Sequence, residues 1–261
     1  MISARDRLAV TDLTTVLTGY FDLPTVLDTV AYDARIGFDA LSASVILLDG
    51  DNRVDDTGIQ VVAEALREGV DIDPALLARG PGPDCARSGA VTMVADFEDS
   101  DDTRWANYRQ EALQAGIRGV RGFPLRVLGK SIGALVVHTA DPWGVERTSE
   151  LGLMLANLAA LAISVAPHSD QRRSDASETI EALLRGTVAI AIATGLIAEL
   201  SDVEPARARL HLQRLARAHQ VTVTTHADAI VTAYNEDPHG FTASSLLAAP
   251  PPQSASPHID V

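Results

Sequence analysis

Four arginines lie close together in the C-terminal third of the chain: Arg207, Arg209, Arg214 and Arg217. No acidic residue occurs between Glu204 and Asp228, although the whole chain carries a formal charge of −14. A guanidinium group is planar, permanently charged and able to bind phosphate with two parallel hydrogen bonds. Phosphate contacts in turn supply much of the affinity for nucleic acid. The cluster is therefore a candidate phosphate-binding surface, and its alternative is a solvated helix face.

A second group of side chains, in the N-terminal half, could line a small-molecule pocket. Its members are Cys85, Trp105, Tyr108, Phe123 and His138. Aromatic residues at such spacings also build ordinary cores. A histidine within the apolar run "VVHTAD" is typical of a packed core side chain. Both interpretations stay open for these residues.

Patterns typical of catalysis and of metal binding are missing from the sequence. The single cysteine excludes an intramolecular disulfide and a multi-cysteine metal site. The acidic run "EDSDD" at 98–102 indicates a solvated loop. No glycine-rich phosphate loop, nucleophile elbow or His/Cys/Asp cluster occurs. We therefore expect no enzyme activity, no cofactor and no metal, and the cysteine count fits a reducing, cytoplasmic setting.

The elements of the N-terminal half alternate between helix and strand patterns. Asp22 and Pro24 mark the start of a helix over 22–38, because they suit the cap and the first turn. Apolar runs predict strands at 42–49 and 90–97 and a hairpin at 119–141, and 58–66 fits either strand or helix. We expect a Gly/Pro loop at 78–90 and helices at 103–116 and 147–166.

The chain changes character after Pro167. We expect a connector at 167–177 and helices at 178–200, from 202–205 to 219 and at 225–234, with a short strand pattern "VTVT" at 221–224. Thr225 and Asp228 resemble a capping pair. The tail 235–261 is rich in Pro, Ser and Ala, so we expect it to be disordered. The sequence thus predicts an α+β domain over 1–166 and a helical domain over 178–234.

The first C-terminal helix is apolar on every side, since "GTVAIAIATGLIA" at 186–198 contains no charged residue. A helix that is apolar all round must be buried all round. We predict that a second copy of the chain covers it, giving a homodimer through this helix and the 147–166 helix. Burial against the N-terminal domain is the alternative. The apolar stretch at 151–166 is short for a membrane span, so we expect no membrane partner.

The C-terminal helices resemble the ANTAR domain, the RNA-binding module of transcription antitermination regulators. The resemblance rests on "IAIATGLIAEL…EPARARLHLQRLARAHQVTVTTHADAIV". The matching positions are Ile190, Ala193, Gly195, Ala208, Leu212, Ala216, Ala227, Ile230 and Val231. It implies a three-helix bundle that binds RNA hairpins. The nucleic-acid-binding residues implied are Arg185, Thr194, Arg207, Arg209, Arg214, Arg217 and His219.

The N-terminal half resembles a GAF domain from about Leu23 to Ala166. The motifs that carry the likeness are "TRWANYRQEALQAGIRGVRGFPLRVLGKSIGALVVHT" and "GPGPDCARSGAVTMVADF". The resemblance implies a mainly antiparallel sheet, helices on one face and a pocket for an unknown small-molecule ligand on the other. A long connecting helix would join this sensor to the ANTAR-like bundle.

Together the two resemblances imply a cytoplasmic regulator that senses a ligand or partner and binds RNA hairpins to control transcription termination. The chain departs from the ANTAR pattern at Thr187 and Thr194, which replace basic residues, and at Arg209, which replaces an aromatic residue. These departures favour an alternative, a protein–protein or dimerisation module without RNA binding. A DNA-binding helical regulator is a third hypothesis.

Overall fold

The structure is a computed structural model that describes residues 22–48, 58–100, 103–165, 176–238, 241 and 245–248. The chain forms two compact units, residues 1–187 and 188–261. We describe each unit by itself. The units divide inside a helix, whereas the sequence predicted a boundary at the connector 167–177.

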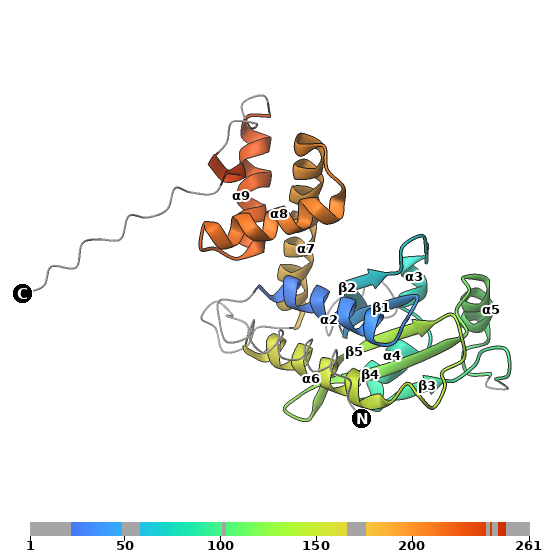
Figure 1. Ribbon diagram of the computed structural model, residues 1–261. Helices are drawn as coiled ribbons and strands as arrows, with labels where there is room; N and C mark the ends of the chain where they lie inside the picture. The colour runs from blue at the N-terminus through green and yellow to red at the C-terminus, as the bar shows by residue number, and fades with distance from the viewer. Residues whose placement is uncertain are drawn as a thin grey trace, which may run out of the picture. The chain divides into compact units, whose positions relative to one another are not determined.

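The first unit is built on one five-stranded antiparallel sheet (Figure 1). Its strands are β1 (Ser42–Leu48), β2 (Ile59–Leu66), β3 (Thr92–Val94), β4 (Gly119–Val127) and β5 (Lys130–Thr139), in the spatial order β2-β1-β5-β4-β3. The antiparallel sheet of the predicted α+β fold is thereby confirmed. The ambiguous stretch 58–66 is the strand β2, at one edge of the sheet. The strand expected at 90–97 shortens to β3.

Among the described residues, the helices that lie wholly within this unit are α2 (Leu23–Gly37), α3 (Pro74–Leu77), α4 (Pro81–Ser88), α5 (Ala106–Gln114) and α6 (Ser149–Val165). The predicted start of α2 is confirmed, because the Asp22 carboxylate accepts a hydrogen bond from the Thr25 backbone N–H at 3.3 Å. A side-chain acceptor at this position satisfies one of the amides that the first helical turn leaves unpaired.

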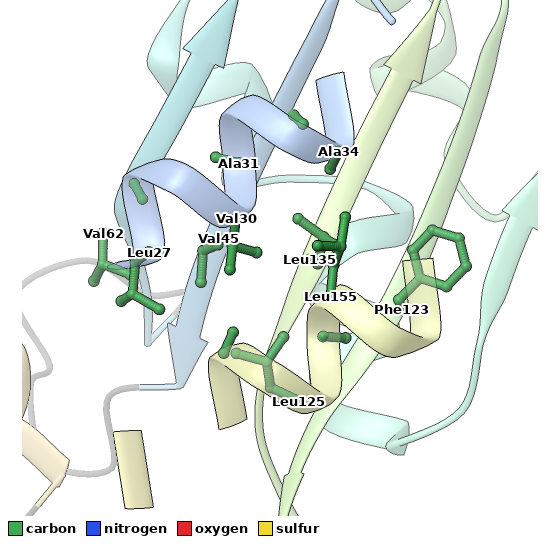
Figure 2. Close-up of a cluster of buried hydrophobic side chains, with 14 of the residues drawn as sticks. Leu27, Val30, Ala31, Ala34, Val45, Val62, Phe123, Leu125, Leu135 and Leu155 are labelled. Atoms are coloured by element: carbon green, nitrogen blue, oxygen red, sulfur yellow. The ribbon is translucent and has the colours of Figure 1, made fainter. Parts of the chain in front are cut away.

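The helices form a layer on each face of the sheet. Figure 2 shows α2 and α6 over one face, where Val30, Leu135 and Leu155 belong to one buried cluster. On the other face, side chains of α3, α4 and α5 pack against Ile46 and Val136 in a second cluster. Because strand residues alternate between faces, Leu135 and Val137 meet the first layer while Val136 and His138 meet the second.

The segment 78–90, expected as a loop, contains the helix α4, so that prediction is wrong. Pro81 stands in the first turn, where its fixed φ suits a helix and its missing N–H costs nothing. Gly80 adopts a φ of +76°, and a Cβ there would lie 2.6 Å from the Tyr108 ring. A Cβ on Gly82 would lie 2.7 Å from Val136. The glycines that suggested a loop therefore let a helix approach the sheet closely.

The second unit is helical. Its elements are the C-terminal part of α7 (Ala176–Ser201), α8 (Pro205–Ala218), α9 (Val223–Glu236) and the short 3-10 helix η2 (Ser245–Leu247). The three long helices occur where the sequence predicted them. They share one core that includes Ala193 and Ile197 of α7, Leu212 of α8 and Ile230 of α9.

Two predictions for the C-terminal region are wrong. The "VTVT" stretch is not a strand: Thr222 caps α9, and its Oγ1 accepts a hydrogen bond from the Thr225 N–H at 3.1 Å, so the expected Thr225–Asp228 pair is not the cap. The region after 235 is not wholly disordered, because Phe241 is buried and packs edge-on against Tyr234. Residues 249–261 lie outside the described part of the chain, as does most of the predicted connector.

The helix α7 is long and apolar. In the part of the chain that the structure describes, Ile180–Ser201 is the one helix that could cross a membrane by length and composition. Its Ile190, Ala193 and Ile197, however, lie in the core of the helical unit. A core helix of a soluble protein has the same composition, and this packing accounts for one face of α7.

Gly152 lets α6 lie directly on Phe123, and this contact generates a stability prediction. A Cβ at Gly152 would come within 2.3 Å of the Phe123 ring, which is stacked on Phe38 with ring centroids 5.8 Å apart and cannot withdraw freely. We expect Gly152→Ala to lower the free energy of unfolding by about 1–3 kcal/mol in urea denaturation.

Gly195→Ala is the matched control, since Gly195 is also inside a helix but a Cβ there would meet nothing within 4 Å. Alanine favours a helix over glycine by up to about 1 kcal/mol, so the control should be as stable as the wild type or more stable. Equal stability of Gly152→Ala and the wild type would contradict the close packing of α6 on Phe123.

Candidate ligand-binding face and candidate nucleic-acid interface

A buried chain of hydrogen bonds crosses the sheet face that α4 and α5 cover. The His138 ring on β5 lies between two hydroxyls: Ser42 Oγ is 2.9 Å from its Nδ1, and Tyr108 Oη is 3.0 Å from its Nε2. Hydroxyls can donate or accept, so both nitrogens of a neutral imidazole are satisfied in either tautomer. The three residues tie β1, β5 and α5 together.

Burial decides the protonation state of His138. The side chain is 1% exposed, and its burial lowers the pKa of the imidazole to about 4. The ring is therefore neutral at physiological pH. This environment agrees with the interpretation of His138 as a packed core histidine, and its two hydroxyl partners show how that polar group is accommodated.

Cys85 lies on the same face, in α4. It is buried, and a Cβ on Gly122 of β4 would come within 2.7 Å of the Cys85 Cβ. Burial raises the pKa of the Cys85 thiol to about 11, so the thiol stays protonated and unreactive. Cys85 is a packing residue of this face.

The other two pocket candidates, Trp105 and Phe123, lie on opposite faces of the sheet. Trp105 is partly buried at the edge of the α4–α5 layer and donates from Nε1 to the Asp84 carboxylate at 2.8 Å. Phe123, in contrast, faces α2 and α6 on the opposite side of the sheet, as Figure 2 shows. The structure thus brings Cys85, Trp105, Tyr108 and His138 to one face and excludes Phe123 from it.

Sequence analysis missed two polar residues on this face, Ser44 and Glu64. They are directly opposed partners on β1 and β2. Ser44 is fully buried and Glu64 half-buried, yet Ser44 Oγ and Glu64 Oε1 have no hydrogen-bond partner among the described residues. Burial raises the pKa of the Glu64 carboxyl above its usual value. Strict alternation in "IQVVAEAL" would place Glu64 on the face opposite Val61. The β-bulge at Val62 brings Glu64 to the same face as Val61, so no local pattern signals this position.

The arginines of the second unit form an exposed stripe on α8. Arg207, Arg214 and Arg217 are exposed, and Leu210 continues the same line at helical spacing. The line is about 15 Å long, because ten residues of helix rise that far. The inward side of α8 carries Ala208, Leu212, Leu215 and Ala216, all of them buried. Arg209 is half-buried at the flank of the stripe.

Three further residues implied by the resemblance are placed differently. Thr194 is half-buried, and its hydroxyl oxygen is buried and has no hydrogen-bond partner within the described residues, so this hydroxyl does not face solvent. Arg185 is exposed and donates from Nε to the Glu181 carbonyl at 3.3 Å. Arg185 belongs to the first unit, whereas the α8 stripe belongs to the second.

His219 is engaged by the C-terminal segment. Its Nε2 lies 2.9 Å from the Ala248 carbonyl, and Nε2 of His226 lies 3.0 Å from the Leu246 carbonyl. A carbonyl only accepts, so both imidazoles donate. The two rings stack with centroids 4.8 Å apart. This arrangement occupies Nε2 of His219 and leaves Nδ1 as its remaining polar atom for any contact with RNA.

The depressed pKa of His138 has a consequence for acid stability. The unfolded state binds a proton at this histidine below its ordinary pKa of about 6.5, whereas the folded state binds it only near pH 4. Stability is therefore full above pH 6.5 and is lost as the pH falls toward 4. Between these limits we expect roughly 3 kcal/mol of the free energy of unfolding to be lost through His138.

Urea denaturation at several pH values would measure this loss in the wild type and in His138→Gln. The variant has no imidazole to protonate, so its stability should depend less steeply on pH between 6.5 and 4. Other groups titrate in both proteins and cancel in the comparison. Equal slopes for the two proteins would show that His138 is not buried in its neutral form.

Comparison with known proteins identifies the first unit. The GAF domain family model matches residues 22–163, which is 142 of the 261 residues. The match ends before α7. No curated protein matches the chain.

Several solved structures are similar at low sequence identity. The phycocyanobilin-bound GAF domain from a cyanobacterial phytochrome is 16% identical, with 62% of this chain and 96% of that chain covered and a TM-score of 0.49. The PixJ GAF domain of Thermosynechococcus elongatus is 18% identical, with 54% of this chain and 84% of that chain covered and a TM-score of 0.41.

For the chromophore-binding domain of the bacteriophytochrome RpBphP3 from R. palustris the identity is 16%, the coverage of this chain 62% and the TM-score 0.46. The chain spans 60% of the length of that domain. The family match extends over more than half of the chain, and its residues form the antiparallel sheet with its two helical layers. The chain belongs to the GAF domain family, which indicates a sensory role.

Proposed function

We propose that this protein is a cytoplasmic, non-enzymatic regulator that senses a small molecule through its GAF domain and binds RNA hairpins through its C-terminal helices. Binding would change transcription termination. The observation that supports RNA binding is the exposed stripe of Arg207, Arg214 and Arg217 on α8. None of the three forms a hydrogen bond or ion pair with another described residue through its side chain.

The overall negative charge of the chain restricts RNA binding to a local basic surface such as the stripe on α8. The protein is strongly acidic overall, so diffuse attraction to polyanions is excluded and any RNA contact must use a local patch. Arginines spread along about 15 Å of helix can contact several phosphates of one strand. Leu210, exposed within the stripe, adds an apolar surface against which a sugar or an unpaired base can pack.

The sensing half is supported by the polar groups that converge on the α4–α5 face of the sheet. A small-molecule site combines an apolar surface with a few placed polar groups. This face offers Ser44, Glu64 and the Tyr108–His138 pair within an apolar cluster. The helix α7 contributes Ile180 and Leu183 to the core of the first unit and Ala193 and Ile197 to that of the second. We infer that α7 links sensing to binding.

Binding of a tandem-hairpin RNA tests the RNA half. We expect the wild type to bind, and Arg214→Ala/Arg217→Ala to bind more weakly. The slope of log K against log salt should become shallower by about 1.4–1.8, since each lost phosphate contact removes about 0.7–0.9. A filter-binding titration at several salt concentrations gives both quantities.

Arg126→Ala/Lys130→Ala is the matched control for this test. It also removes two positive charges, from exposed positions on the β4–β5 hairpin, and should leave RNA affinity unchanged. Equal losses in the two double variants would assign the effect to net charge. No hairpin binding by the wild type, with or without small molecules that stabilise the GAF domain, would refute the RNA half.

A second candidate function is a protein-interaction module that forms a homodimer. The observation that favours it is an apolar side of α7 that no other described residue fully covers: Val188 is 56% exposed and Ile192 46% exposed. A Cβ at Gly195, on the same side, would meet nothing within 4 Å. A second copy of α7 packed here would remove these side chains from water, which is favourable by about 25 cal/mol per Å² of apolar surface.

Sedimentation velocity tests the dimer directly. We expect the wild type to sediment as a dimer and Val188→Glu/Ile192→Glu to sediment as a monomer with unchanged helix content, because two buried carboxylates would oppose pairing. Leu128→Glu, at a fully exposed position in the β4–β5 turn, is the control and should remain dimeric. A monomeric wild type would rule out this interface.

A further inference from the structure

Ser44 and Glu64 stand out because their hydrogen bonds are incomplete in a region where neighbouring polar groups are fully paired. Two residues earlier on the same face of β1, Ser42 Oγ is hydrogen-bonded to His138 Nδ1 at 2.9 Å, and His138 Nε2 is hydrogen-bonded to Tyr108 Oη. Ser44 Oγ and Glu64 Oε1 have no partner among the described residues, although both atoms are buried. A buried polar atom without a partner costs about 1–3 kcal/mol. Such a cost calls for a physical reason.

The register of the sheet places the two oxygens so that a single group can join them. Ser44 and Glu64 are directly opposed on the antiparallel strands β1 and β2, so their side chains point to the same face. Opposed side chains have Cβ atoms about 4.5–5.5 Å apart. A nitrogen with two or more N–H bonds makes hydrogen bonds of about 2.9 Å each and can therefore span two such oxygens.

The charge of the carboxylate selects among such groups. Burial raises the pKa of the Glu64 carboxyl, because a charged carboxylate is costly away from water. A positively charged nitrogen would compensate the carboxylate and satisfy both acceptors at once. The surroundings are apolar, since Ile46, Val61 and Val136 belong to the cluster on this face. The complementary ligand therefore has an ammonium group on an apolar body.

The edge of the sheet is the route to these residues that the strand order offers. β2 is the outermost strand on its side, and Glu64 is only half-buried. A ligand entering past Glu64 would reach Ser44 on the next strand inward.

We propose that Ser44 and Glu64 form a binding site for the primary ammonium group of a small amine with an aliphatic body. The proposal rests on the proposed function, because it assigns the chemical class of the ligand that the GAF domain senses. Glu64 supplies the negative charge and one acceptor, and Ser44 supplies the second acceptor.

The test uses the full-length protein and three probes of similar size. n-Butylammonium chloride carries both the charge and the N–H groups, 1-butanol has a similar chain without the charge, and tetramethylammonium chloride has the charge without an N–H. Binding is followed by NMR chemical-shift titration and by the thermal midpoint of unfolding. We expect only n-butylammonium to bind saturably and to raise the midpoint.

Two conservative variants locate the site. Glu64→Gln keeps the size and removes the charge, and Ser44→Ala removes only the hydroxyl. Each should weaken n-butylammonium binding about tenfold or more, since a hydrogen bond to a charged group contributes about 1.5–3 kcal/mol. In the absence of amine, Ser44→Ala should unfold at the same temperature as the wild type or higher, because its hydroxyl has no partner to lose. Thr29→Ala, on α2 of the opposite layer, should bind as the wild type does.

Each contrary result has a definite meaning. Saturable binding of 1-butanol or tetramethylammonium with equal affinity would overturn the proposal, as would n-butylammonium binding that survives in both variants. Destabilisation by Ser44→Ala without amine would show that its hydroxyl is bonded within the protein, for example to a buried water, and would also overturn it. Absence of amine binding, together with binding of other metabolites on the same sheet face, would reject the ammonium site and leave ligand sensing intact.

Discussion

The central strands β1 and β5 of the first unit are buried on both faces, so each of their buried side chains packs against one of two helical layers. Leu135 and Val137 must suit α2 and α6, while Val136 and His138 must suit α4 and α5. A histidine is tolerated in that position only because Ser42 and Tyr108 come from two other elements to meet its ring nitrogens. The position of α5 on this face of the sheet therefore depends on a polar residue within the apolar run of β5.

Sequence patterns predicted most of this framework, because long apolar strands and a capped helix are local features. The hairpin 119–141 and the helices α2 and α6 follow from periodicity, and Asp22 marks the first of these helices by its own chemistry. α4 was missed because Gly80 and Gly82 resemble loop residues. Their absent side chains serve close packing against Tyr108 and Val136, and such distant neighbours cannot be known from a local pattern.

The candidate site residues also fall into those that a local pattern predicts and those that it does not. Helical periodicity alone places Arg207, Arg214 and Arg217 outward, and the structure agrees. Membership of a face is harder to predict for a strand whose register is unknown. Phe123 was grouped with Tyr108 although it pairs with Leu135 and faces α6. Ser44 and Glu64 were missed altogether, because their opposition depends on pairing between strands with a β-bulge beside it.

Two kinds of buried polar group therefore coexist on one side of the sheet, and their energetics differ. In the Ser42–His138–Tyr108 chain every ring nitrogen is bonded, so the group stabilises one arrangement of β1, β5 and α5. Ser44 Oγ and Glu64 Oε1 carry the opposite cost, since both atoms are buried without a hydrogen-bond partner among the described residues. A site that lowers the stability of the unliganded protein gains the most when a complementary group arrives, because the same atoms that opposed folding then favour binding. By this argument, a ligand at the proposed Ser44–Glu64 site would stabilise the folded domain by removing the cost that these two atoms carry.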